Sequence, residues 1–301
     1  CITAATLVRL LAVTTYTGGT CMTTVARPPV NEVAISISFE PQSALEGPRL
    51  LVGLGEILAE FPQVTEVQPY EMADERPFEE RIVQPPAPQI QFVNSSQMPR
   101  RYWLTGLNDS NLLLQVQANY FALNWRRQEG GEYYPGFEHL LERFEHYLLM
   151  LQSAVLKQGG QALNVSQLEL TYINLLHPDA LWGSIRDVHK VVTVRVPDVD
   201  EIDQLSVSYS EPVWDESSSF YGRMHTAVST GYQPKEQPTE LRPLSIKDMT
   251  PVINISITTR SARIKDVAES VKTRFKTAHD AVTGTFNRIT SDEARASWGL
   301  S

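Results

Sequence analysis

One stretch of strict alternation constrains the fold of this chain more than any other feature of its sequence. In "NEVAISISFEP", residues 31–41, apolar side chains alternate with small or polar ones: Val33, Ile35, Ile37 and Phe39 share one parity. Successive side chains of a β-strand point to opposite faces of the sheet, so this stretch predicts a strand with one buried face. Similar stretches recur along the chain, and the short turn sequences between them favour antiparallel pairing.

Two other stretches place apolar residues three and four positions apart, which is the spacing of an amphipathic helix. The first covers residues 136–157, and the second begins at Ile264 and ends at Ile289. At about 1.5 Å per residue the second helix would be roughly 40 Å long, enough to cross a sheet. We therefore predict an α+β protein in which amphipathic helices pack on one face of antiparallel sheets, in two halves of similar plan with a long C-terminal helix.

The order of these patterns also suggests a domain organisation. We expect an N-terminal half at residues 28–178 and a C-terminal half at residues 188–301. Residues 71–99 are acidic and then proline-rich, which is typical of a long loop or lid. Residues 1–21 do not begin with Met, and their apolar part is too short to span a bilayer. We expect them to be a non-native or disordered extension, with the native chain starting at Met22.

The bulk composition disfavours several classes of function. The 301 residues are 42% hydrophobic and carry a formal net charge of -9. An acidic chain repels phosphate backbones, so non-specific nucleic-acid binding is not expected. The two cysteines, Cys1 and Cys21, both precede the first predicted strand, which fits a cytoplasmic protein without disulfides or thiolate metal sites. No apolar run reaches the length of a transmembrane helix, so we predict no membrane association.

No short motif of a nucleotide-binding, nucleophilic or metalloprotease site is present in the sequence. The most metal-like set is His139, Glu142 and His146, whose spacing puts them near one face of a helix. That face lies opposite the apolar one, where no neighbouring groups would orient metal ligands. We therefore expect these side chains to be solvated, and we predict neither a metal nor a cofactor.

The end of one predicted strand gives the first candidate binding residues. Trp125 has the same parity as the apolar residues before it, so Asn124 and Arg126 should point away from the core, with Arg127 next in the chain. The following "QEGGE" predicts a glycine turn, and Pro135 suits the first turn of a helix. The arginines near that helix start would allow anion binding, while the alternative is a simple strand-to-helix connection.

Three more candidates lie in the C-terminal half. His225 is on a predicted strand and would be a base only with an orienting partner. Lys272 and Lys276 follow apolar residues of the last helix and line one edge of it, together with Lys265 and His279. Their stems could cover the boundary of the core, or their charges could form a basic edge for an acidic protein partner.

Several short sequences carry a resemblance to a known family. They are "PPVNEVAISISFEP" (28–41), "LQVQANYFALNWRR" (114–127), "YPGFE" (134–138), "ELTYINLL" (169–176) and "AHDAVTGTFNRIT" with "WG" (278–299). In their order and spacing the chain resembles the sporadically distributed "sporadic family" of uncharacterised prokaryotic proteins. Gly136, Phe137 and Leu300 depart from the family's pattern. The resemblance implies no established activity, and the patchy distribution of the family implies an accessory or defence-associated role.

Together these observations favour a non-enzymatic binding or interaction protein, with a protein partner or a small ligand. Two alternatives stay open. The first is an enzyme that acts on a small or nucleotide-like substrate under loop 71–99, drawing on Arg126, Arg127 or His225. The second is a carrier for an apolar small ligand, held in a cavity between the sheet and the last helix.

Overall fold

The computed structural model describes most of the chain. The described residues are 28–46, 48–77, 100–107, 109–128, 134–193, 203–235, 245–264 and 270–300. Several positions of the sequence predictions lie outside them: the extension at 1–21, residues 78–99 of the predicted loop, both glycines of the "QEGGE" turn, and Lys265.

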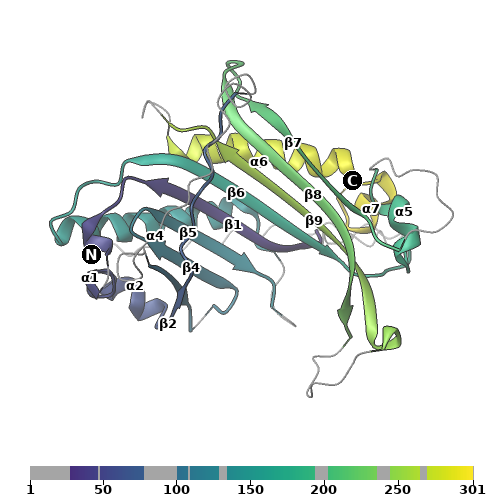
Figure 1. Cartoon of the computed structure of the whole chain (residues 1–301), viewed down its shortest axis with the longest axis horizontal. Helices are drawn as coiled ribbons and strands as arrows, with labels where there is room; N and C mark the ends of the chain where they lie inside the picture. Colours follow the sequence, from purple (N-terminus) through teal and green to yellow (C-terminus); the bar gives the residue numbers. More distant parts are fainter. Residues whose placement is uncertain are drawn as a thin grey trace, which may run out of the picture.

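In the described ranges the strands form one nine-stranded antiparallel sheet at the centre of the molecule (Figure 1). The strands are β1 (Val30–Phe39), β2 (Gln63–Val67), β3 (Arg101–Thr105), β4 (Leu112–Gln117), β5 (Tyr120–Arg126), β6 (Val165–Leu176), β7 (Ser206–Trp214), β8 (Phe220–Pro234) and β9 (Met249–Ser261). They lie in the order β2-β3-β4-β5-β1-β6-β9-β8-β7. Because β6 of the predicted N-terminal half pairs with β9 of the predicted C-terminal half, segments of both share one sheet.

Two long helices, α4 (Phe137–Lys157) and α6 (Val271–Ile289), lie behind the sheet in Figure 1 and cover one of its faces. The shorter helices are α1 (Pro48–Gly53), α2 (Gly55–Glu60), α5 (Val188–Val191) and α7 (Asp292–Ser297), and short 3-10 turns occur at Ser43–Leu45, Ile185–Asp187 and Ile246–Asp248. This arrangement confirms the predicted α+β class with an antiparallel sheet. Within the described ranges, no helix is both long and apolar enough to cross a membrane.

The main core lies between this face of the sheet and the two long helices. Ile35 of β1 has Leu123 of β5 and Leu170 of β6 as its cross-strand neighbours, and all three are buried. Phe144 of α4 packs edge-on against Phe275 of α6, with 5.4 Å between the ring centres. Burying an apolar side chain of this size contributes about 1.5–3 kcal/mol to stability. The side chains that form this layer are those that the alternating strand pattern and the helical stripes predict to be buried.

The C-terminal helix is shorter than the sequence predicted. It begins at Val271 rather than Ile264, because Ser270 caps it by accepting a hydrogen bond from the Thr273 N–H at 3.1 Å. Serine is preferred at such a cap, where its hydroxyl satisfies a free backbone donor. Ile264 instead donates its N–H to the carbonyl of Ser166 at 2.8 Å. With 19 residues the helix is roughly 28 Å long, not 40 Å.

Helix α4 also begins later than predicted. Pro135 does not lie in its first turn, because the N-cap is Gly136 and the first helical residue is Phe137. Gly136 has a φ of 97°, a backbone conformation that glycine adopts without steric cost and other residues rarely adopt. The chain therefore turns sharply at Gly136, and Pro135 stays in the connection before the helix.

Candidate functional site

The face of the sheet that α4 and α6 leave uncovered, here called the open face, is polar and is crossed by an extended segment. This segment, residues 68–77, follows β2 and is called the strap. Its hydrogen bonds reach from β4 to β8: Tyr70 N–H to Gln117 Oε1 at 2.9 Å, Gln167 Nε2 to Ala73 O at 2.9 Å, and Arg223 Nη2 to Arg76 O at 3.1 Å. The strap therefore lies across the strands rather than beside an edge.

Charged side chains of the strap and the sheet meet in a group called the strap cluster, which consists of Glu75 of the strap and Glu169, Arg223, His225 and Arg260 of the sheet. Glu75 Oε1 is 2.7 Å from His225 Nε2 and 3.0 Å from Arg260 Nη1. Glu75 Oε2 is 3.4 Å from Arg223 Nε. The side chains of Glu75 and Arg223 are only 6% and 4% exposed, so His225 and two arginines surround one buried carboxylate.

A second carboxylate completes the strap cluster. Arg260 donates from Nε to Glu169 Oε2 at 2.6 Å, and the Tyr70 hydroxyl donates to Glu169 Oε1 at 3.0 Å. Burial, together with the charge of Glu169, raises the pKa of Tyr70 to about 12. Tyr70 therefore stays protonated at neutral pH and acts as a donor to this carboxylate.

The charge of Glu75 is maintained against its burial. Burial alone would raise the pKa of Glu75, but the hydrogen bond and charge of His225, with those of Arg260, outweigh it and hold the pKa below its ordinary value. Two arginines then face two ionised glutamates, so the strap cluster is electrically balanced apart from His225. A balanced and hydrogen-bonded group of this kind is tolerated in a buried position.

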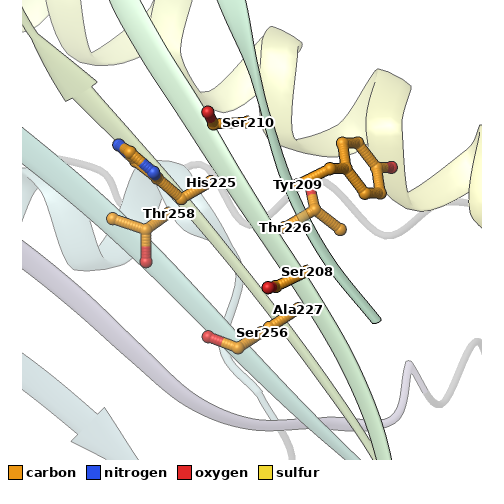
Figure 2. Close-up of a pocket in the computed structure, with 8 residues that line it drawn as sticks. All are labelled: Ser208, Tyr209, Ser210, His225, Thr226, Ala227, Ser256 and Thr258. Carbon is orange, nitrogen blue, oxygen red and sulfur yellow. The ribbon is translucent and has the colours of Figure 1, made fainter. Parts of the chain in front are cut away.

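The open face is hollowed next to His225. This hydroxyl hollow has a volume of about 360 Å³, and its lining includes Ser208, Ser210, His225, Ala227, Ser256 and Thr258. Figure 2 shows the imidazole of His225 on the same side of the strands as Thr258, while Tyr209 points toward the side that α6 covers. Because its lining carries short side chains with hydroxyl groups, the hollow offers hydrogen-bond donors and acceptors at close range.

A second hollow lies on the helical side of the sheet, beside α6. This aromatic hollow has a volume of about 450 Å³, and its lining includes Val30, Tyr134, Tyr172, His279, Val282 and Phe286. The hydroxyls of Tyr134 and Tyr172 are 2.8 Å apart, and the Tyr172 hydroxyl is 3.1 Å from His279 Nδ1. The imidazole of His279 also stacks on the ring of Phe137 at 4.0 Å.

Burial keeps this chain of polar groups uncharged. It raises the pKa values of Tyr134 and Tyr172 above their ordinary value, and it lowers the pKa of His279. At neutral pH the three side chains are thus two phenols and a neutral imidazole, joined by hydrogen bonds. The aromatic hollow is suited to an apolar molecule with an uncharged polar group.

The residues predicted at the end of β5 lie on the open face but away from the strap cluster. Asn124 is buried, accepts from Gln115 Nε2 at 2.7 Å and donates to Glu32 Oε1 at 2.5 Å. Arg126 Nε is 3.2 Å from the same Glu32 oxygen, and Arg127 Nη2 donates to the carbonyl of Pro28 at 3.0 Å. Since β5 and β8 are four strand positions apart, roughly 19 Å separates this group from His225.

The lysines predicted on the last helix lie on the opposite side of the sheet. Lys272 Nζ is 3.3 Å from Glu145 and Lys276 Nζ is 3.7 Å from Glu138, both on α4. These ion pairs join the two long helices. The predicted site residues therefore fall in three separate places, and only His225 belongs to the strap cluster.

The metal-like set of α4 lies on the surface. His139, Glu142 and His146 are exposed, as their spacing predicted. In the part of the chain that the structure describes, no three His, Cys, Asp or Glu side chains are arranged to hold a metal ion.

Most of the strap cluster was not identified from the sequence, although part of it left a signal. Glu169, Arg223 and Arg260 interrupt strands whose other residues are mostly apolar or small, and a charge inside such a strand indicates a buried partner. Glu75 gave no such signal, because it lies among other charged residues in a stretch without periodicity.

Fold and site together define an α+β protein with one helix-covered face and one polar face that a strap crosses. Comparison with protein-family models gives no match for this chain, and comparison with curated proteins gives none either. The resemblance to the sporadic family therefore stays a prediction.

Proposed function

We propose that this is a non-enzymatic binding protein that holds a small, largely apolar molecule in the aromatic hollow. The observation that carries the proposal is the combination of an apolar lining with a partly buried chain of hydrogen bonds from Tyr134 through Tyr172 to His279. Small-ligand sites typically have this composition, in which apolar walls provide affinity and a few polar groups set orientation.

The lining also indicates the chemistry of the ligand. A volume of about 450 Å³ is within the usual size of small-molecule sites. Aromatic side chains favour a flat ring, since offset or edge-on ring contacts add to the hydrophobic gain. Because Tyr172 and His279 are uncharged at neutral pH, the polar group of the ligand should be neutral too, such as a hydroxyl or carbonyl. The ligand class is thus a flat apolar molecule with one such group.

Titration with 2-naphthol, an uncharged aromatic with one hydroxyl, tests this proposal by fluorescence. Thr283 is exposed at the hollow, so Thr283→Trp should obstruct it and weaken binding at least about tenfold, which is about 1.4 kcal/mol. Thr277→Trp is the matched control, because Thr277 is on the same helix but not in the lining. Equal affinity of the two variants, or no wild-type binding below about 1 mM, would contradict the proposal.

A second candidate is an enzyme that acts on a small or nucleotide-like substrate at the open face. It is favoured by the 2.7 Å contact between His225 and Glu75, since a carboxylate that orients an imidazole is a common arrangement for a general base. The hydroxyl hollow beside His225 would hold the substrate. Phosphorus NMR tests this candidate by measuring the rate at which the protein converts a nucleoside monophosphate. If His225→Gln converts the nucleotide as fast as the wild type, the candidate is wrong.

We also propose that the two halves share one plan. In each half, a central strand leads by way of short helices to the edge of the sheet, the following strands step back toward the centre, and a long helix closes the half. The strand order supports this if β6, which the sequence prediction placed in the N-terminal half, is counted with the C-terminal one, so that β1 to β5 precede α4 and β6 to β9 precede α6.

The remaining expectations from the sequence are kept as proposals. They are membership of the sporadic family, an accessory or defence-associated role, a cytoplasmic location, and a protein partner. The ion pairs of Lys272 and Lys276 with α4 give these lysines a role within the fold, so an acidic partner would have to compete with Glu145 and Glu138.

A further inference from the structure

The strap places one acidic side chain against the sheet and leaves its neighbours outside. Asp74 and Arg76 are exposed, whereas Glu75 between them is buried and meets His225, Arg260 and Arg223. The sheet therefore presents a preformed set of donors, and the strap supplies the carboxylate that fills it.

The charges of the sheet require an anion at this position. Without Glu75, Arg223 and Arg260 would face Glu169 alone, which leaves one positive charge unbalanced even with His225 neutral (two minus one). The side chains of Arg223 and Arg260 are 4% and 15% exposed, so water compensates this charge poorly. A buried charge without a counter-charge is strongly unfavourable, and any state in which Glu75 leaves would need another anion.

We propose that Arg223, His225 and Arg260 form an anion-binding site in which Glu75 occupies the place of a ligand's phosphate or carboxylate. Arginine forks match the oxygens of either group and bind them in two-point contacts. The hydroxyl hollow opens directly beside His225 and would receive the rest of the ligand. The ligand class is therefore a small anion on a polar body that can hydrogen-bond to hydroxyl groups.

Glu75 does not provide a hydrogen-bond acceptor for every donor of this site, so a ligand anion with more oxygens could compete with it. The Nε atom of Arg223 is buried and lacks a hydrogen-bond partner among the described residues, although Glu75 lies 3.4 Å away. A phosphate has more oxygens than a carboxylate and would reach this donor as well. The other contacts of the strap include an ion pair of Asp74 with Arg263 at 3.4 Å and packing of the Tyr70 ring on Tyr120. It is otherwise held by hydrogen bonds rather than by strand pairing, and each such bond contributes only about 1 kcal/mol.

This site is independent of the aromatic hollow, because the two lie on opposite faces of the sheet. An anion-binding site and a purely structural ion cluster also predict different results when Glu75 is changed. The strap acts as an internal competitor, so removing the charge of Glu75 should increase the affinity for external anions instead of only lowering stability.

Titration calorimetry with inorganic phosphate, at constant ionic strength adjusted with chloride, tests the proposal. Glu75→Gln keeps the size of the side chain and removes its charge, and it should bind phosphate at least about tenfold more tightly than the wild type. Asp74→Asn is the matched control, because it removes the same charge from the next residue of the strap, and it should bind like the wild type. Adding Arg260→Gln to Glu75→Gln should abolish the gain.

A gain that is absent in Glu75→Gln, or equal in Asp74→Asn, would overturn the proposal. Citrate in place of phosphate distinguishes a carboxylate ligand from a phosphate ligand. If Glu75→Gln does not fold, hydrogen exchange of the wild type decides. The amides of strap residues 68–77 should exchange faster in phosphate than in chloride at equal ionic strength, and equal rates would refute the displacement of Glu75.

Discussion

At the scale of one residue, the burial of His279 makes the stability of the whole protein depend on pH. Burial is the main cause that lowers its pKa below the ordinary value of 6.5, and nearby Asp280 and Glu138 oppose this only in part. In the unfolded chain the imidazole would take up a proton first as the pH falls. Acid therefore favours unfolding through this residue, beginning where the unfolded imidazole titrates.

We predict that the free energy of unfolding decreases between about pH 7 and about pH 5, and that His279→Phe reduces this decrease. Phenylalanine keeps a ring to stack on Phe137 but cannot bind a proton. Urea denaturation at a series of pH values measures the effect. His177→Phe is the control, because His177 is exposed and should leave the slope unchanged. A slope that is the same in wild type and His279→Phe would show that another group dominates.

For single residues at the end of β5, the sequence predicted on which face of the sheet a side chain lies, but not which side chain it contacts. Alternation places Asn124 and Arg126 on the face opposite Trp125, as in the structure, because the parity of a strand fixes the side on which each side chain lies. Their common partner, Glu32, is 92 positions from Asn124 along the chain. No local pattern encodes such a pairing, and for the same reason Glu75 could not be matched to Arg260.

At the scale of elements, the periodicities identified the strands and long helices, while the ends of the helices depended on single residues. Alternation predicted β1 and the 3.6 period predicted α4, because these patterns follow from which side chains must be buried. The start of α6 is set by the hydroxyl of Ser270, and the start of α4 by the positive φ of Gly136. Both are local backbone effects that an apolar stripe does not reveal.

Strand β8 contains two glycines that differ in what a side chain would meet. A Cβ added to Gly222 would lie 2.1 Å from the carbonyl oxygen of Arg260 on the neighbouring strand β9, whereas a Cβ on Gly231 would have no atom within 4 Å. The close approach involves backbone, which cannot move aside as a flexible side chain can. Gly222 is therefore required for the pairing of β8 with β9 beside the strap cluster.

We predict that Gly222→Ala lowers the free energy of unfolding by about 2 kcal/mol or more, because β8 must move away from β9. Gly231→Ala, in the same strand, should change it by about 0.5 kcal/mol or less. Urea denaturation of both variants measures the difference. Similar values for the two would mean that β8 and β9 adjust without cost at Gly222.

At the scale of the whole molecule, β6 pairs with β1 on one side and with β9 on the other, so N-terminal and C-terminal segments lie in one sheet. The sequence left open whether the predicted halves share a sheet, since the pairing of β6 with β9 joins distant segments: the hydroxyls of Thr171 and Thr258 are 2.9 Å apart and 87 positions apart along the chain. Ile35 of β1 is buried near the middle of this sheet, with Leu123 of β5 on one side and Leu170 of β6 on the other. Its side chain therefore packs beside the strand, β6, that continues the sheet to β9.

We therefore predict that the protein unfolds in one transition, and that Ile35→Ala destabilises both halves together by about 2–5 kcal/mol. Hydrogen exchange of β4 and β8, which lie on opposite sides of the centre, should show the same loss of protection, because strands of one cooperative unit open with a common free energy. Val64→Ala is the control, since Val64 is 38% exposed on the edge strand β2. If Ile35→Ala lowers protection in β4 and leaves β8 unchanged, the halves unfold separately and the shared sheet does not couple them.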